Sequence, residues 1–209
     1  MIQSGGGALA DKNRLAAVIP AAGMSSRMGA FKPLLPFGGE TVIEASVGNA
    51  LSAADKAAVV LGKRGGEIKE LLLTRFRERL IFTENPDYAS TDMLCSVRIA
   101  LRALGDCGGF FIAPADMPLL SPAVYRLLAD SFTDDDEILI PAVGGKRGHP
   151  PLIAARLIPA VLAYDGTDGL RGFYRTHRVR EIPVADKGAL TDIDTPVDYR
   201  TLLRENNRF

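Results

Sequence analysis

Two cations stand in a loop of small residues near the start of the chain. The loop reads Ala21-Ala-Gly-Met-Ser-Ser-Arg-Met-Gly-Ala-Phe-Lys32 and follows a short apolar run at 15–19. Small residues let backbone N–H groups approach a phosphate closely, and Arg27 and Lys32 would neutralise its charge. The residue types therefore predict a phosphate-binding loop. The alternative is a glycine-rich strand-to-helix turn that carries two surface cations.

The spacing within this loop excludes two common phosphate-binding motifs. Five residues separate Gly23 from Gly29, and Lys32 comes three residues after Gly29, so the Walker A pattern is not met. The G-x-G-x-x-G pattern of dinucleotide-binding loops is not met either. What remains is A-A-G-x-S-x-R-M-G-x-x-K, a pattern that fixes many residue types at set offsets.

Three aspartates are candidates for a metal site. Asp116 follows a strand-like run at 109–114, and open α/β sheets bind ligands beyond the carboxyl ends of their strands, where the loop after 15–19 also lies. A carboxylate that faces bound phosphates there would hold Mg²⁺, with a turn or helix-capping role as the alternative. Asp192 and Asp194 alternate on an expected strand at 190–193 and would share one face, as metal ligands or as turn and capping residues.

An alternation of strands and helices has to position these side chains. The strands are expected at 15–19, 57–61, 80–83, 109–114, 138–141, 151–154, 179–184 and 190–193, and the helices at 41–51, 67–77, 93–104, 122–130, up to 163, 170–177 and from 196. Capping signals support three helix starts, at Thr41 with Glu44, at Ser121 and at Thr195 with Asp198. This pattern predicts a mostly parallel sheet with helices on both faces, and the irregularity after residue 137 indicates an antiparallel insertion. The acidic run at 133–137 is interpreted as a solvated loop.

Composition limits the class of protein. We expect one domain at 14–209, preceded by a flexible lead-in at 1–13. The 25 basic and 25 acidic residues balance, which argues against a nucleic-acid partner. No apolar run approaches the ~20 residues of a membrane helix, so no membrane partner is expected. Cys95 and Cys107 are predicted to be free thiols in a reducing cytoplasm.

The loop pattern resembles the signature of the MobA/MocA-like nucleotidyltransferases, and most closely their molybdopterin cytidylyltransferase branch. The family's D-M-P motif is matched by Asp116-Met117-Pro118, and the resemblance extends from Leu15 to Leu203. It implies a single Rossmann-like three-layer α/β/α domain whose mixed, mostly parallel sheet has about seven strands. It also implies a Mg²⁺-dependent reaction in which an acceptor phosphate attacks the α-phosphorus of a nucleoside triphosphate and pyrophosphate leaves.

The resemblance assigns roles to residues of this chain. Arg27 would stabilise the leaving pyrophosphate, Lys32 the α-phosphate, and Asp116 the metal ion, completed by Asp192 or Asp194. The implied nucleotide-binding residues are Ala21, Ala22, Gly23, Ser25, Ser26, Arg27, Met28, Gly29, Lys32, Asn85 and Ser96. The implied acceptor-binding residues are His149, in a Gly-His-Pro motif, and Asp168 and Arg171, in a loop similar to the family's G-D-x-G-x-R.

Two departures from the family pattern concern substrate contacts. Thr167 interrupts the acceptor loop, and Ser90-Thr91-Asp92 replaces the usual glycine before Met93. The Ala21-Ala22-Gly23 form matches the cytidylyltransferases and favours CTP over GTP. The resemblance implies molybdopterin as the acceptor and a client molybdoenzyme as a further partner. The alternatives are a guanylyltransferase of the same branch, a transferase for a sugar phosphate, methylerythritol phosphate or phosphocholine, a glycosyltransferase, and a non-catalytic nucleotide-binding partner.

Overall fold

The computed structural model describes residues 14–23 and 28–206. The predicted lead-in at 1–13 lies outside the described residues, and so do three of the predicted site residues, Ser25, Ser26 and Arg27.

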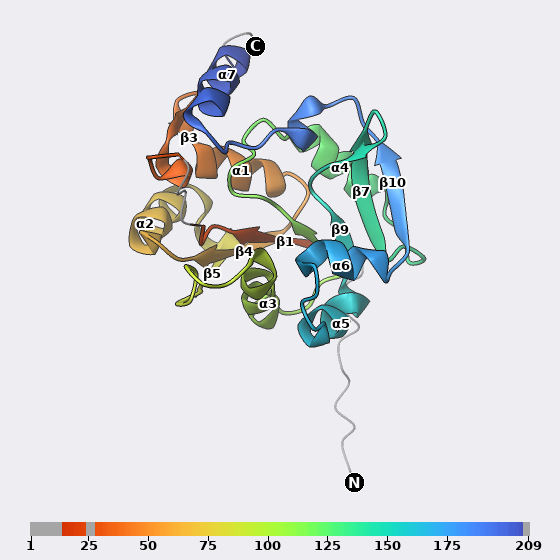
Figure 1. The fold of residues 1–209 in the computed structure, drawn as a ribbon. Helices are drawn as coiled ribbons and strands as arrows, with labels where there is room; N and C mark the ends of the chain where they lie inside the picture. The colour runs from red at the N-terminus through yellow and green to blue at the C-terminus, as the bar shows by residue number, and fades with distance from the viewer. Residues whose placement is uncertain (1–13, 24–27, 207–209) are drawn as a thin grey trace.

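One mixed sheet forms the centre of the molecule (Figure 1). Its strand order is β10-β7-β9-β6-β1-β4-β5, and β8 pairs with β7 alone. β1 lies between β4 and β6 and is parallel to both, whereas β9 is antiparallel to β6 and β7. The strands are β1 (Leu15–Pro20), β4 (Lys56–Leu61), β5 (Leu80–Glu84), β6 (Gly109–Ile112), β7 (Ile138–Val143), β8 (Lys146–Arg147), β9 (Leu152–Ala154) and β10 (Val179–Pro183). The antiparallel insertion is therefore found where the sequence predicted it, after residue 137.

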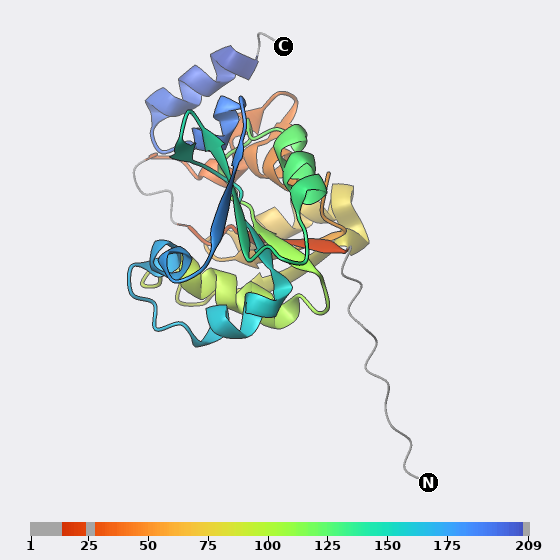
Figure 2. The ribbon, with the colours of Figure 1, turned by 90° about the vertical axis from the view of Figure 1, so that its right-hand side faces the viewer.

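Helices cover both faces of this sheet (Figures 1 and 2). The α-helices of the described residues are α1 (Val42–Ala50), α2 (Gly65–Phe76), α3 (Met93–Ala103), α4 (Pro122–Ser131), α5 (Ile158–Ala163), α6 (Gly169–Arg175) and α7 (Pro196–Asn206). Ala17 and Ile19 of β1 join the core under α1, α2 and α4, whereas Ala16 and Val18 join the core under α3, α5 and α6. Neighbouring residues of a strand point to opposite faces, so β1 is buried on both sides and its sequence is continuously apolar. The predicted three-layer α/β/α domain is confirmed.

A third, smaller core joins the segment after β1 to the last described helix. Met28, Phe37 and Leu202 pack together there with Val42, Ala45 and Ile193. Phe37 belongs to a two-stranded hairpin of β2 (Pro36–Phe37) and β3 (Glu40–Thr41), and Leu202 belongs to α7. This core anchors the part of the signature loop that carries Met28. Among the described residues, none of the helices is long and apolar enough to cross a membrane.

Two of the three predicted capping motifs are present. Thr41 and Glu44 form the predicted capping box of α1. The Oγ1 of Thr195 accepts from the backbone N–H of Asp198 at 3.3 Å, and the Asp198 carboxylate accepts from the N–H of Thr195 at 2.7 Å. Ser121 precedes α4 as predicted, but its side chain makes no capping hydrogen bond.

The strand expected at 190–193 is wrong. Residues Lys187–Leu190 form a 3-10 helix instead, and 191–194 have no regular secondary structure. The Asp186 side chain accepts from the N–H of Gly188 at 2.8 Å and thereby starts the 3-10 helix. The N–H of Ile193 then donates to the carbonyl of Asp116 at 3.1 Å, which ties this segment to the loop after β6 rather than to a sheet edge. The argument that strand alternation puts Asp192 and Asp194 on one face therefore fails.

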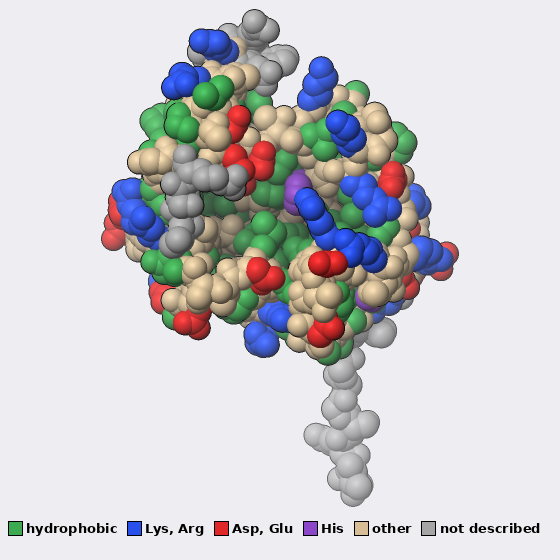
Figure 3. All heavy atoms as spheres, viewed as in Figure 1, with side chains coloured by type: hydrophobic (Ala, Val, Ile, Leu, Met, Phe, Trp, Pro, Cys, Tyr) green, Lys and Arg blue, Asp and Glu red, His purple; other side chains and the backbone are tan. Residues whose placement is uncertain are grey.

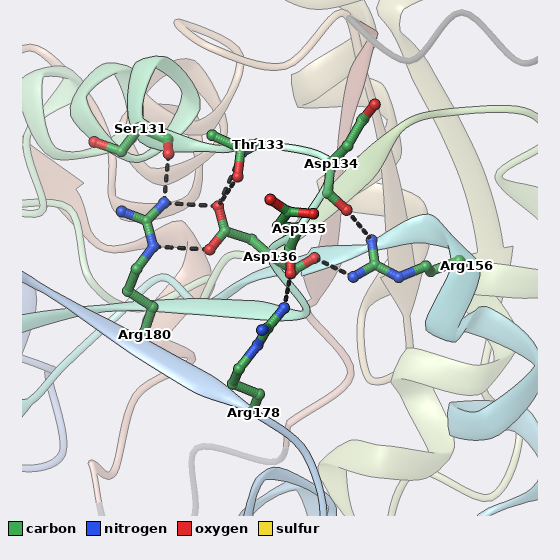
Figure 4. A network of polar contacts seen from close by, with 8 residues as sticks. All are labelled: Ser131, Thr133, Asp134, Asp135, Asp136, Arg156, Arg178 and Arg180. Carbon is green, nitrogen blue, oxygen red and sulfur yellow. Dashed lines mark hydrogen bonds and ion pairs between the residues drawn. The ribbon is translucent and has the colours of Figure 1, made fainter.

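The acidic run at 133–137 is not a simple solvated loop. Asp136 is buried, and both of its carboxylate oxygens accept hydrogen bonds from Arg180 at 2.7 Å (Figure 4). Arg156 donates to the carbonyls of Asp134 and Asp136, and Arg178 to that of Asp135. Arginines from distant parts of the chain therefore hold this loop in place, although its composition alone indicates a solvated loop.

Candidate active site

A cleft of about 220 Å³ opens at the carboxyl ends of the central strands. Ala21, Ala22 and Gly23 enter it directly after β1, and Asp116 enters it after β6. Because β1 and β6 are parallel neighbours, the two loops emerge at the same edge of the sheet. The loop after β1 and the aspartate after β6, predicted to meet, therefore line one cleft, which we call the first cleft. Its described lining residues are Pro20, Ala21, Ala22, Gly23, Lys32, Pro33, Tyr88, Thr91, Asp92, Met93, Ser96, Pro114, Ala115 and Asp116.

Lys32 lies between two carboxylates in the first cleft. Its Nζ is 2.8 Å from Oδ1 of Asp194 and 3.4 Å from Oδ2 of Asp116. The Lys32 side chain is 11% exposed, and those of Asp116 and Asp194 are about one-third exposed. A buried ammonium is unfavourable unless it is paired, and here two acids from separate segments provide the pairing. The contact joins residues that are 84 and 162 positions apart in the sequence.

Asp116 and Asp192 form an electrostatic pair. Burial raises the pKa of the Asp116 carboxyl, Lys32 opposes that rise, and the negative charge of Asp192 adds to it. Asp192 also acts on His149, whose pKa burial lowers and Asp192 partly restores. A cation would relieve the repulsion between these two acids, so a partly buried carboxylate beside a second acid is suited to a divalent metal ion.

The three predicted metal ligands do not form a complete site by themselves. Within 14–23 and 28–206 there is no group of three or more His, Cys, Asp or Glu residues that could hold a metal ion. Mg²⁺ usually takes only one or two protein carboxylates and fills its remaining positions with water and substrate phosphates. Asp116 with Asp192 fits that mode, while Lys32 contacts both Asp116 and Asp194.

Asn85 supports the wall of the first cleft from behind. Its amide donates to Oγ1 of Thr91 at 2.9 Å and to Oγ of Ser96 at 3.2 Å, and its Oδ1 accepts from the N–H of Asp87 at 3.1 Å. Asn85 is 3% exposed and does not belong to the described lining, whereas Thr91 and Ser96 do. Ser96 therefore lies in the lining of the first cleft, and the Asn85 side chain holds it in this position through a hydrogen bond.

Some of the described residues of the signature loop line the first cleft, and others lie outside it. Ala21, Ala22 and Gly23 line the first cleft, and a Cβ at Gly23 would meet no atom of the described residues within 4 Å. Met28 is instead buried in the third core, and Gly29 has a φ of +69°, a conformation that favours glycine. Neither belongs to the described lining of the cleft.

A second cleft of about 620 Å³ adjoins the first. Its apolar wall includes Leu94, Ile140 and Leu170, and its polar residues include three arginines and all three predicted acceptor residues, His149, Asp168 and Arg171. Figure 3 shows this face, with a histidine and several Lys or Arg side chains beside a hollow in which hydrophobic side chains are visible. The two clefts share Asp92 and Met93, at the start of α3, so their contents would meet there.

The polar groups of the second cleft are not all equally available. Asp168 pairs with Arg175 at 2.5 Å, and Arg147 pairs with Glu181 at 2.8 Å. The Nδ1 of His149 is buried without a hydrogen-bond partner among the described residues, and burial lowers its pKa. Unsatisfied buried polar atoms are rare, so this nitrogen is suited to a ligand contact.

Several lining residues were not among the predicted site residues. They are Tyr88, Thr91, Asp92 and Met93 in the first cleft, and Arg147, Tyr174 and Arg175 in the second. Met93 is apolar yet 47% exposed, and its position at the start of a helix gave no sign of this. Arg147 stands two residues before His149, and that proximity to the Gly-His-Pro motif was the available signal.

Comparison with known proteins places the chain in context. Residues 17–182 match the family described as the MobA-like NTP transferase domain. A molybdenum cofactor cytidylyltransferase of Escherichia coli K12 is 32% identical over 184 residues, which cover 88% of this chain and 93% of that protein. A probable molybdenum cofactor guanylyltransferase of Mycolicibacterium paratuberculosis is 27% identical, with 93% and 98% covered.

Solved structures agree with this placement. A nucleotidyl transferase from Methanothermobacter superposes with a TM-score of 0.79 at 28% identity, covering 94% of this chain and 99% of that one. A Mycobacterium tuberculosis H37Rv protein in complex with manganese superposes with a TM-score of 0.70 at 25% identity, covering 91% and 98%.

Proposed function

The chain belongs to the MobA-like NTP transferase family, and we propose that it transfers CMP from CTP to molybdopterin. As a member of that family it is a nucleotidyltransferase. The observation that carries the proposal is the pair of joined clefts. One is lined by Gly23, Lys32 and Asp116, and the other by His149 and Arg171.

The reaction needs no nucleophile from the protein. A phosphate oxygen of the acceptor attacks the α-phosphorus, a new P–O bond forms, and the bond to the β-phosphate oxygen breaks to release pyrophosphate. Catalysis then depends on positioning and on stabilising the charge of the transferring group. The Lys32 ammonium would contact the α-phosphate, backbone N–H groups of the signature loop would hold the triphosphate, and Arg27, outside the described residues, would act on the leaving group.

Mg²⁺ is the metal ion that we propose for this site. Asp116 and Asp192 would hold it together with phosphate oxygens, and it would neutralise charge on the triphosphate. The manganese complex of the mycobacterial protein supports a divalent ion in this fold.

The preference for CTP rests on Ala22. This residue is 4% exposed in the wall of the first cleft. Gly62 packs closely against it, because a Cβ at position 62 would come within 2.9 Å of the Ala22 Cβ. Glycine at position 22 would widen a cleft of only about 220 Å³, and alanine suits the smaller pyrimidine. The cytidylyltransferase relative has a higher identity than the guanylyltransferase, which points the same way.

The chemistry of the second cleft supports molybdopterin as acceptor. A flat ring system would lie against the apolar side chains of Leu94, Ile140 and Leu170, while Arg171 bound its phosphate. A sugar phosphate or phosphocholine would leave most of this apolar wall without a partner. A guanylyltransferase with the same acceptor is the nearest alternative.

The test is to incubate the protein with Mg²⁺, molybdopterin and each nucleoside triphosphate in turn, and to follow pyrophosphate. We expect release with CTP. Release with GTP alone would make it a guanylyltransferase, and no release with any phosphorylated acceptor would favour a non-catalytic nucleotide-binding protein.

Two variants test the residues that we assign to the chemistry. Lys32→Ala and Asp116→Ala should each lower kcat by at least ~10²-fold, as expected for lost transition-state stabilisation. Asp55→Asn is the matched control, since this acid pairs with Arg14 at 3.3 Å at the opposite edge of the sheet and is half exposed. Wild-type rates in both site variants would remove these residues from the mechanism.

A further inference from the structure

We propose that Tyr174 is a specificity-determining residue of the second cleft, whose hydroxyl group hydrogen-bonds the polar edge of a flat, nitrogen-containing ring system in the acceptor. Tyr174 lies three residues beyond Arg171, the last residue of the loop that resembles the family's acceptor motif. The inference rests on the proposed function for the identity of the acceptor. It adds which part of the acceptor is recognised and by which group.

The Tyr174 side chain combines an anchored ring with an unused hydroxyl group. The ring packs on the core under α3, α5 and α6 and meets the ring of Phe173 edge-on, at a centroid distance of 6.5 Å. The hydroxyl group has no hydrogen-bond partner among the described residues, and the side chain lines the second cleft. A largely buried tyrosine hydroxyl usually finds a partner, so this group is available to a ligand in the cleft.

A second tyrosine beside Phe173 shows the contrast. The ring of Tyr164 meets that of Phe173 at 5.6 Å and packs on the same core. Its hydroxyl group, however, donates to the carbonyl of Thr167 at 2.6 Å and so supports the fold. Phenylalanine at position 174 would make the same apolar contacts as tyrosine, so packing alone does not account for the Tyr174 hydroxyl.

The position of Tyr174 is fixed by the close packing of α6. A Cβ at Gly172 would overlap the carbonyl oxygen of Thr167 and the hydroxyl of Tyr164, so the helix lies directly against the segment before it. Arg171 and Tyr174 are three residues apart on this helix and both line the second cleft. A phosphate bound at Arg171 would therefore bring the rest of the acceptor past Tyr174.

The surroundings of Tyr174 indicate the chemistry of its ligand. Burial raises the pKa of the phenol, so the hydroxyl stays protonated at neutral pH and can donate as well as accept. The unpartnered Nδ1 of His149 belongs to the same cleft. These two groups suit a ring whose edge carries nitrogen and oxygen atoms, while Leu94 and Leu170 contact its faces. A sugar phosphate would set hydroxyl groups against those apolar side chains, which is unfavourable.

A binding experiment tests the hydroxyl group without requiring turnover. Neopterin phosphate, a fluorescent pterin with one phosphate, is titrated into the wild type, Tyr174→Phe and Tyr125→Phe, and ribose 5-phosphate serves as the competitor without a pterin ring. Tyr125→Phe is the matched control, since this tyrosine is buried on the other face of the sheet, edge-on to Phe111.

We expect Tyr174→Phe to bind neopterin phosphate about 3- to 10-fold more weakly than the wild type, the effect of one lost hydrogen bond. Its affinity for ribose 5-phosphate should be unchanged, and Tyr125→Phe should match the wild type with both ligands. Equal affinity of Tyr174→Phe and the wild type for neopterin phosphate would overturn the proposal. So would a wild type that shows no preference for neopterin phosphate over ribose 5-phosphate.

Steady-state kinetics separates this inference from the proposed function. With Mg²⁺, CTP and molybdopterin, Tyr174→Phe should raise the KM for molybdopterin by about 3- to 10-fold and leave the KM for CTP and the urea midpoint unchanged. Loss of affinity for both substrates together with a lower urea midpoint would make Tyr174 a packing residue and refute the inference. Binding of neopterin phosphate that depends on Tyr174, without release of pyrophosphate, would refute the proposed transfer and support the recognition of the ring.

Discussion

Asp136 is the residue whose replacement should most clearly change how the stability of the protein depends on pH. It is 7% exposed, and its carboxylate accepts two hydrogen bonds from Arg180 and two from Thr133, all between 2.7 and 2.9 Å. Burial alone would raise the pKa of this carboxyl, but the hydrogen bonds from Arg180 and Thr133 outweigh burial and lower the pKa to about 2.

The magnitude follows from that pKa. The pKa of an aspartate in an unfolded chain is about 3.9, so the lowered value corresponds to about 2.6 kcal/mol of stability, because a pKa change of one is worth about 1.36 kcal/mol. Arg180 is 44% exposed and solvent screens the pair, so we expect about 2 kcal/mol. A carboxylate with a depressed pKa stabilises the fold above its unfolded pKa, and this contribution is lost as pH falls through the folded value. About half should remain at pH 3 and little at pH 2.

Urea unfolding of the wild type and Asp136→Asn across this pH range measures the effect. The variant should be less stable by about 2 kcal/mol at pH 7, and the gap should narrow steadily toward pH 2. Asp135→Asn is the matched control, since this exposed neighbour contributes its carbonyl, not its carboxylate, to Arg178. A gap that stays constant with pH, or an equal loss in Asp135→Asn, would refute the argument.

Three further predictions concern the clefts and the helix that supports them. Arg171→Ala should raise the KM for the acceptor by about 10-fold or more and leave the KM for the nucleotide unchanged, as steady-state kinetics would show. Ala22→Gly should lower the preference for CTP over GTP by about 10-fold, the order expected for one methyl group, measured as the ratio of the two kcat/KM values. Thr41→Ala removes half of the α1 capping box and should cost about 1 kcal/mol in urea unfolding, with no change in substrate preference.

The features that the sequence predicted are those set by local pattern and by the geometry of parallel sheets. β1 is apolar throughout because both of its faces are buried, and that run was visible as a strand. The prediction that the loop after β1 and Asp116 lie close together needed only the rule that neighbouring parallel strands end at the same edge of a sheet. The family signature added the acceptor residues, which the structure gathers in the second cleft.

The features that escaped prediction depend on partners far away in the chain. Asp136 belonged to an acidic run, and nothing nearby revealed a buried pair with Arg180, 44 residues later. Asp192 and Asp194 were given to a strand because polar and apolar residues alternate there. The segment instead bonds to Asp116 and Lys32, and such tertiary hydrogen bonds have no local pattern. Asn85 was predicted to contact the nucleotide because its segment resembles the family's nucleoside-binding segment, and nothing in that resemblance revealed the hydrogen bonds by which its amide holds Thr91 and Ser96.

The two clefts meet at Asp92, which belongs to the stretch that replaces the family's usual glycine before Met93. A carboxylate where two phosphates would meet should oppose the reaction by repulsion, yet Asp92 belongs to both clefts. Its Oδ1 accepts from the N–H of Cys95 at 3.0 Å and caps α3, so the positive end of that helix partly offsets its charge. Lys32 in one cleft and Arg171 in the other supply cations near the same join. The arrangement can therefore keep a carboxylate at this point while the two clefts hold anionic substrates.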